Sequence, residues 1–98
     1  MDNAWRTDSE GYYIEMDQGE KKDYSLDWTD YPGLTTLAAV TWTLNANLTK
    51  LLQAENGKVT QVTLYASGNK GVWACSLAWE EAAGGVPKEV FNFRVVIK

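Results

Sequence analysis

Alternation of apolar and polar side chains with a period of two is the feature that most constrains the fold of this chain. It is clearest in the stretches 72–80 and 90–98. A period of two places successive side chains on opposite faces of a β-strand. The pattern therefore predicts two half-buried strands, whose inward residues are Trp73, Cys75, Leu77, Trp79, Phe91, Phe93, Val95 and Ile97.

The same alternation occurs earlier, at 12–17, 24–28, 36–44 and 59–67. The β-branched and aromatic residues of these segments suit a pleated, half-buried surface. Segment 46–54 leaves two alternatives open, because its leucines have helical spacing but also fit an irregular strand. The expected inward residues are Tyr12, Ile14, Met16, Tyr24, Leu26, Trp28, Ala38, Val40, Trp42, Leu44, Thr60, Val62, Leu64 and Ala66.

Turn signals separate the predicted strands. Asn56-Gly57 is a strong hairpin signal, since both residues tolerate positive φ. Further turns are expected at 19–20, 31–33, 68–71 and 84–87. Six or seven short strands so spaced predict an all-β, antiparallel sandwich or barrel. We expect a single domain over 12–98, preceded by an N-terminal arm over 1–11.

Composition argues against most catalytic chemistry. The 98 residues include no histidine and one cysteine, so the chain has no imidazole base, no internal disulfide and no thiolate zinc site. Cys75 is expected to be a small buried hydrophobe. The carboxylates Asp27 and Asp30 fit a turn better than a glycosidase pair, which needs a substrate cleft. We expect no enzyme activity, no cofactor and no metal.

The charge distribution argues against nucleic acid as a partner. The net charge is −4, and residues 1–33 hold nine acids and three bases. Nucleic-acid binding relies on clustered Lys and Arg, which this chain lacks. No apolar run approaches the ~20 residues of a membrane helix, and the first residues do not resemble a signal peptide. We therefore expect no membrane partner and synthesis in a cytoplasm.

Five tryptophans are the main candidates for binding as well as for packing. Trp28, Trp42 and Trp73 lie on inward faces, which favours the core. Trp79 lies near the end of its strand, where a rim or interface role is an alternative. Trp5 lies in the polar arm, where it either folds back or anchors to a partner. An unprotected acidic first strand could also add to a neighbouring subunit.

From Tyr24 onward, the order of motifs resembles the small fibre–tail adaptor proteins of tailed bacteriophages. The similar segments are 24–30 (Tyr-Ser-Leu-Asp-Trp-Thr-Asp), 36–44 with Thr41-Trp42-Thr43, 64–73 with its glycine turn, and the closing strand 91–97. The match covers about three-quarters of the chain. Residues 1–20 extend beyond the usual start of the family, and the turn after Ser67 lacks an expected second glycine.

The resemblance implies an antiparallel immunoglobulin-like β-sandwich of about seven strands. It also implies a virion protein that acts as a fibre–tail adaptor or as a neck or tail subunit. Such a protein is made in the cytoplasm of the bacterial host and docks to other virion proteins in a ring-like, multicopy assembly. The expected partner-binding residues are Trp5, Tyr13, Tyr31, Pro32 and Trp79. The alternatives are a carbohydrate- or receptor-binding module, a capsid decoration protein, or a small regulator of a host protein.

Overall fold

The computed structural model describes residues 4–84 and 88–98, and this part of the chain is all-β. It has eight strands, one more than the expected number of about seven. Their bounds are β1 Arg6–Asp8, β2 Gly11–Met16, β3 Lys21–Asp27, β4 Leu37–Thr43, β5 Thr49–Asn56, β6 Val59–Tyr65, β7 Gly71–Glu81 and β8 Glu89–Ile97. The additional strand, β1, lies within the segment that was expected to be an arm.

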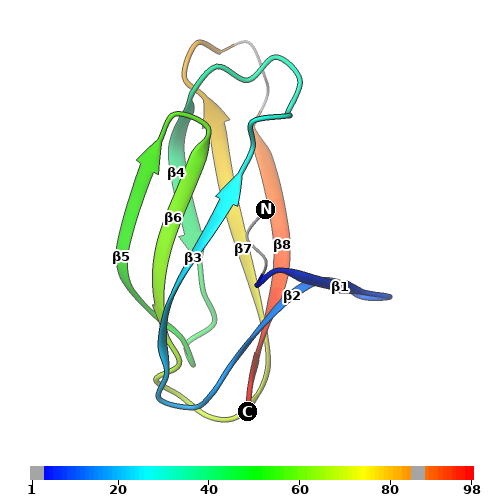
Figure 1. The fold of residues 1–98 in the computed structure, drawn as a ribbon, viewed down its shortest axis with the longest axis vertical. Coiled ribbons are helices and arrows are strands. Elements are labelled where there is room, and N and C mark those ends of the chain that lie inside the picture. The colour runs from blue at the N-terminus through cyan, green and yellow to red at the C-terminus, as the bar shows by residue number, and fades with distance from the viewer. Residues whose placement is uncertain (1–3, 85–87) are drawn as a thin grey trace.

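The strands form two sheets (Figure 1). One sheet has five strands in the order β1-β2-β8-β7-β4, and the other has three in the order β3-β6-β5. The three-stranded sheet lies in front of β4, β7 and β8 in Figure 1, so that the inward faces of both sheets meet in one core. This is the two-layer arrangement that strands with one apolar face require.

The expectation of wholly antiparallel pairing is wrong for one strand pair. β2 pairs with β8 in parallel, from Tyr12 opposite Phe93 to Met16 opposite Ile97. The other four strand pairs beyond the β1–β2 hairpin are antiparallel. Alternation identifies which face of a strand is buried but carries no information about direction. A hairpin turn fixes direction only for consecutive strands, and β2 and β8 lie at opposite ends of the chain.

The inward faces of β2, β3, β6, β7 and β8 are the expected ones. The buried residues of these strands include Ile14, Met16, Tyr24, Leu26, Thr60, Val62, Leu64, Cys75, Leu77, Trp79, Phe91, Phe93, Val95 and Ile97. Cys75 is buried as expected, and burial raises the pKa of its thiol. Trp28 and Trp73 are only half-buried and pack against the edge of this core.

The expected face of β4 is wrong at its start. Leu37 and Trp42 are the buried residues of this strand, whereas Ala38 and Val40 are half-buried. The pairing of β4 with β7 shifts register between Ala38 and Thr41. An inserted residue in a strand moves the following side chains to the opposite face. Ala39 lies in this bulge with φ +49°.

Replacing Ala39 by glycine is expected to stabilise the domain by about 0.5–1 kcal/mol. The left-handed region costs a residue with a Cβ about 1–2 kcal/mol, and the added flexibility of the unfolded chain offsets part of the gain. Urea denaturation followed by circular dichroism measures the difference. Ala38→Gly is the matched control and is expected to destabilise, because Ala38 has no positive φ. A lower urea midpoint for Ala39→Gly than for the natural chain would contradict the interpretation that the backbone at Ala39 is strained.

The ambiguous segment 46–54 forms a strand rather than a helix. Leu48 is buried just before β5. The register between β5 and β6 shifts between Lys50 and Leu52, so Leu51 lies in a second bulge. As a result, Leu51 and Leu52 are both exposed. The helical spacing of these leucines therefore comes from a bulged edge strand.

The hairpin expected at Asn56-Gly57 is present, one residue later than its signal. Asn56 pairs with Val59, and the turn residues are Gly57 and Lys58, with Gly57 at φ +61°. Gly19 also has positive φ, in the turn between β2 and β3. For the turn expected at 84–87, residues 85–87 lie outside the described part of the chain.

Candidate partner-binding surfaces

Trp5 directly precedes β1 and is a core residue. It belongs to the flank, which is the side of the domain formed by β1 and β2. Its ring is 9% exposed and contacts Tyr24, Phe91 and Phe93 at centroid distances of 5.2–6.1 Å. Its indole Nε1–H donates a 2.8 Å hydrogen bond to the backbone oxygen of Ser25 in β3. Trp5 thus folds back and connects the two sheets. In this structure the ring is not available as an anchor for a partner.

Arg94 of β8 holds the β1–β2 turn against the outer face of the five-stranded sheet. Its guanidinium lies 2.5 Å from the carboxylate of Asp8 and 3.3 Å from that of Glu10, and donates to the backbone oxygen of Gly11. The same group lies 5.2 Å from the ring centroid of Tyr13. Tyr13 is half-buried beneath this cluster. One face of the flank is therefore an ordered array of charges over an aromatic ring.

Acid is expected to loosen this flank. The hydrogen bond from Arg94 and the backbone N–H of Glu10 hold the pKa of Asp8 below its ordinary value. A lowered folded-state pKa stabilises the folded chain above the unfolded-state pKa, and this contribution is lost as the pH falls through the folded-state pKa. We expect stability to fall more steeply below about pH 4 in the natural chain than in Asp8→Asn.

Urea midpoints measured from pH 7 to about pH 2 test this expectation. Asp30→Asn is the matched control, because Asp30 is exposed and forms no ion pair among residues 4–84 and 88–98. Identical acid profiles for the natural chain and Asp8→Asn would contradict the role of Asp8.

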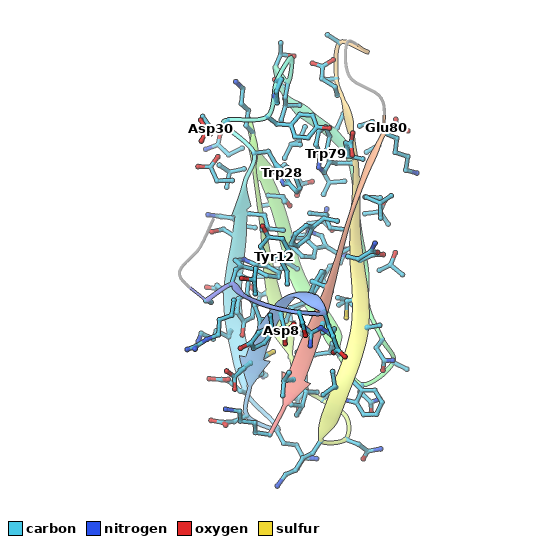
Figure 2. The ribbon with its side chains drawn as sticks, turned by 90° about the vertical axis from the view of Figure 1, so that its right-hand side faces the viewer. Asp8, Tyr12, Trp28, Asp30, Trp79 and Glu80 are labelled. Atoms are coloured by element: carbon cyan, nitrogen blue, oxygen red, sulfur yellow. The ribbon has the colours of Figure 1, made fainter. Side chains whose placement is uncertain are left out.

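A second aromatic cluster closes the end of the domain where β3 and β7 finish (Figure 2). Trp79 has none of its surface exposed, and its ring lies 5.3 Å from that of Trp28 and 5.1 Å from that of Tyr31. Phe91 packs 5.9 Å from Trp28. Trp79 therefore lies inside the domain and not at its rim, because Tyr31, in the loop after β3, packs against its ring.

Tyr31 and Pro32 lie on the outside of this aromatic cluster. The Tyr31 hydroxyl donates to the carboxylate of Glu89 at the start of β8, and this bond raises the pKa of Tyr31. Tyr31 is half-buried and Pro32 is exposed. The indole Nε1–H groups of Trp28 and Trp79 are buried and have no hydrogen-bond acceptor among the described residues. This end of the domain offers Tyr31 and Pro32, rather than a tryptophan, to a partner.

The five expected partner-binding residues do not form one site. Trp5 and Tyr13 belong to the flank of β1 and β2, and Tyr31, Pro32 and Trp79 to the loop end. In Figure 2, Asp8 of β1 lies well below Trp79 and Asp30. Inside the domain, the ring of Phe91 lies between the two groups, 5.6 Å from Trp5 and 5.9 Å from Trp28. Only Tyr13, Tyr31 and Pro32 are accessible to any useful extent.

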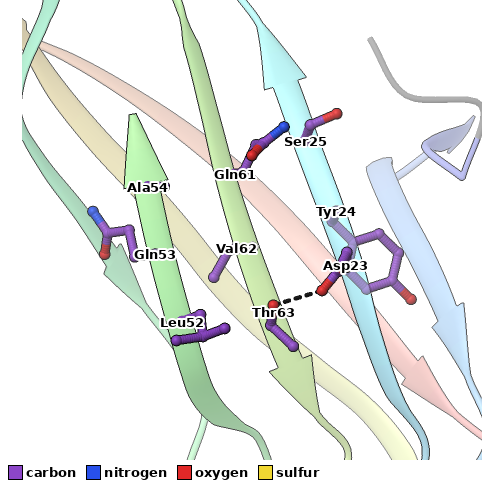
Figure 3. Close-up of a pocket in the computed structure, with 9 residues that line it drawn as sticks. All are labelled: Asp23, Tyr24, Ser25, Leu52, Gln53, Ala54, Gln61, Val62 and Thr63. Atoms are coloured by element: carbon purple, nitrogen blue, oxygen red, sulfur yellow. Dashed lines mark hydrogen bonds between the residues drawn. The ribbon is translucent and has the colours of Figure 1, made fainter. Parts of the chain in front are cut away.

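A groove on the outer face of the three-stranded sheet was missed by the sequence analysis (Figure 3). It has a volume of about 520 Å³. The side chain of Leu52 is 70% exposed on it, and the Thr63 hydroxyl donates a 2.5 Å hydrogen bond to Asp23 across two strands. The outward residues that line it are Asp23, Ser25, Leu52, Ala54, Gln61 and Thr63. Their outward positions follow from alternation, but the exposure of Leu52 follows only from the β5 bulge.

Within the described ranges, no group of three or more His, Cys, Asp or Glu residues could hold a metal ion. The same part of the chain contains no helix long and apolar enough to cross a membrane.

Fold and surfaces together define a two-sheet all-β domain that buries most of its tryptophans and presents polar and charged flanks. No protein-family model matches the chain, and no curated protein matches it. Among solved structures, the chain is similar to the solution structure of amebosin, with a TM-score of 0.45 and 14% identity over 88% of each chain. A likeness at this level carries no argument about function.

Proposed function

We propose that the chain is a non-enzymatic structural protein of a tailed bacteriophage virion. Its role is that of a fibre–tail adaptor or a neck or tail assembly subunit, which docks to neighbouring virion proteins. The proposal starts from the resemblance of residues 24–97 to the small adaptor family. It includes the finer assignment of the two-sheet fold as an immunoglobulin-like sandwich.

Strand connectivity supports the immunoglobulin-like fold that the proposal includes. Counting β3 as strand B, the sheets read B-E-D for β3-β6-β5 and C-F-G for β4-β7-β8. Immunoglobulin-like sandwiches have this order, with a buried tryptophan on strand C. Trp42 takes that place in β4, is buried, and donates a 3.2 Å hydrogen bond to the Thr60 hydroxyl. The chain departs from antibody domains in having no disulfide, since Cys75 is its one cysteine.

The exposed surface supports docking better than sugar binding. Glycan sites usually stack a sugar on an accessible aromatic ring, yet Trp5, Trp42 and Trp79 are buried. The accessible features are instead short charged strands, a loop end and a polar groove. Repeated around a ring, such surfaces bind through many weak contacts, whose combined affinity is high.

Mass spectrometry of purified particles tests the proposal. We expect the chain to be present in particles of the phage that encodes it, at a fixed copy number per particle. Deleting its gene is expected to give particles that lack fibres or have unjoined tails. The control is the same deletion complemented with the natural chain. Particles that never contain the chain, or a deletion that assembles complete particles, would overturn the proposal.

A glycan-binding role makes a different prediction. Titration of the purified chain with a broad panel of glycans would then change its tryptophan fluorescence. We expect flat titrations, since the indole rings are largely shielded. A saturable change would favour the carbohydrate-binding alternative over the adaptor.

A further inference from the structure

β1 is an open edge of the five-stranded sheet. Within the described ranges it pairs with β2 alone, and all three of its residues are exposed. Figure 1 shows β1 extending from the side of the domain, away from both sheets' interior. An exposed edge strand presents unpaired backbone groups that can pair with another chain.

The register of the β1–β2 hairpin shows which backbone groups face this open edge. Asp8 lies opposite Gly11 across the two-residue turn, and Arg6 lies opposite Tyr13. A pair that closes a two-residue turn exchanges backbone hydrogen bonds, and bonded and non-bonded pairs alternate along an antiparallel ladder. Thr7 is therefore the residue whose N–H and C=O point away from β2.

The side chains beside Thr7 carry opposite charges on one face. Arg6 lies 3.7 Å from the carboxylate of Glu15, and Asp8 lies 2.5 Å from the guanidinium of Arg94. Each charged side chain of β1 thus has a partner of opposite sign within its own sheet. Arg6 and Asp8 are also exposed, so a chain that pairs with β1 can reach them.

We propose that β1 is a self-association edge whose partner is a second copy of this chain, paired antiparallel about a two-fold axis at Thr7. In this arrangement the two Thr7 residues exchange two backbone hydrogen bonds, and Arg6 lies opposite Asp8 of the second copy. A two-fold interface makes this pairing reciprocal. The result is a row of alternating charge: Glu15, Arg6, then Asp8 and Arg94 of the second copy.

The other edge strands are each interrupted at one point, which favours β1 as the pairing edge. The β4 edge is interrupted by the bulge at Ala39, and its Val40 oxygen accepts a 3.0 Å hydrogen bond from the side chain of Gln53. The β5 edge has its own bulge at Leu51. On β3, the Ser25 oxygen is taken by the indole of Trp5. Bulges and capped backbone groups are the usual protection against edge pairing.

The three-residue length of β1 limits the strength of the interface. Stable dimers bury about 1,200–2,000 Å², more than one short strand pair provides. We therefore expect weak, reversible association of the isolated chain, visible at high protein concentration. Opposite charges directly across a strand pair contribute about 0.2–1 kcal/mol each, so added salt weakens the dimer. This inference does not depend on a virion role and is tested on the purified chain alone.

The backbone test is Thr7→Pro. Proline removes the N–H that faces the open edge but leaves the bonds of Arg6 and Asp8 to β2, and edge strands tolerate it. Sedimentation equilibrium up to about 1 mM, at low salt, measures the association; Thr7→Ala, which keeps the N–H, is the matched control. We expect Thr7→Pro to associate about tenfold more weakly or worse, and Thr7→Ala to resemble the natural chain. A monomeric natural chain at 1 mM, or equal association of Thr7→Pro, overturns the proposal.

The charge test uses complementary reversals. Arg6→Glu and Asp8→Lys each place like charges opposite one another in a homodimer, so each alone is expected to be monomeric. An equimolar mixture of the two restores opposite charges at both positions and is expected to form a heterodimer. Because the mixture repairs no intramolecular ion pair, its recovery reports on the interface alone. A mixture that sediments like its separate components overturns the proposal. The urea midpoint of each variant verifies that it stays folded.

Discussion

Trp79→Ala is expected to cost about 3–5 kcal/mol of the free energy of unfolding. The ring is fully buried between Trp28 and Tyr31, so its loss leaves a large cavity in the aromatic cluster at the loop end. Small domains have about 5–15 kcal/mol in total. The variant is therefore expected to lower the Tm by about 15–30 °C, or to leave the chain largely unfolded at room temperature. Circular dichroism during thermal and urea denaturation measures the effect.

Leu52→Ala is the matched control for this substitution. Leu52 is a large apolar residue, but it is 70% exposed in the groove of the three-stranded sheet. Substitution at such a site usually changes stability by less than about 0.5 kcal/mol. A cost below about 1 kcal/mol for Trp79→Ala would contradict the burial of this ring and would restore the interface interpretation of Trp79.

Trp5→Ala is expected to have the second largest effect, a loss of about 3–4 kcal/mol. It removes the contacts with Tyr24, Phe91 and Phe93, together with the hydrogen bond to Ser25 that connects the two sheets. Trp5→Phe keeps much of the packing but removes the indole donor, so it is expected to cost about 1–2 kcal/mol. Urea denaturation of both variants, followed by far-ultraviolet circular dichroism, measures the two contributions.

Truncation of residues 1–11 also tests whether this segment, which contains Trp5, contributes to the stability of the domain. If these residues were only a docking arm, the remaining chain would fold with its full stability. Because Trp5 belongs to the core and Gly11 begins β2, we expect the truncated chain to lose at least as much stability as Trp5→Ala. If the truncated chain kept its full stability, residues 1–11 would not contribute to folding and would act only in docking.

Much of the fold follows from alternation. The inward faces of β6, β7 and β8 and the hairpin near Gly57 were predictable, because period two and turn-forming residues are local properties. Of the expected binding residues, Tyr31 and Pro32 lie in an accessible loop, where a turn signal suggested them. Their accessibility depends on local chain composition more than on distant contacts.

Other features depend on contacts between distant residues. The polar sequence around Trp5 suggested an arm, yet the aromatic slot formed by Tyr24, Phe91 and Phe93 holds its ring in the core. The bulge at Ala39 reversed the face of the start of β4. The bulge at Leu51 exposed Leu52 and so shaped the groove. One inserted residue in a strand leaves composition unchanged but inverts the side chains that follow.

The amino-acid sequence by itself determined that this protein is all-β, that its aromatic residues mostly form a core, and that these 98 residues hold no histidine and no internal disulfide. Those conclusions depend on side-chain type and on spacing along one strand. Only the tertiary structure decided that β2 lies parallel to β8, that Trp5 and Trp79 are internal, and that β1 forms an open edge beside Arg94. Each of these depends on which distant segments meet, and pairing between distant strands is set by packing of the whole domain rather than by local pattern.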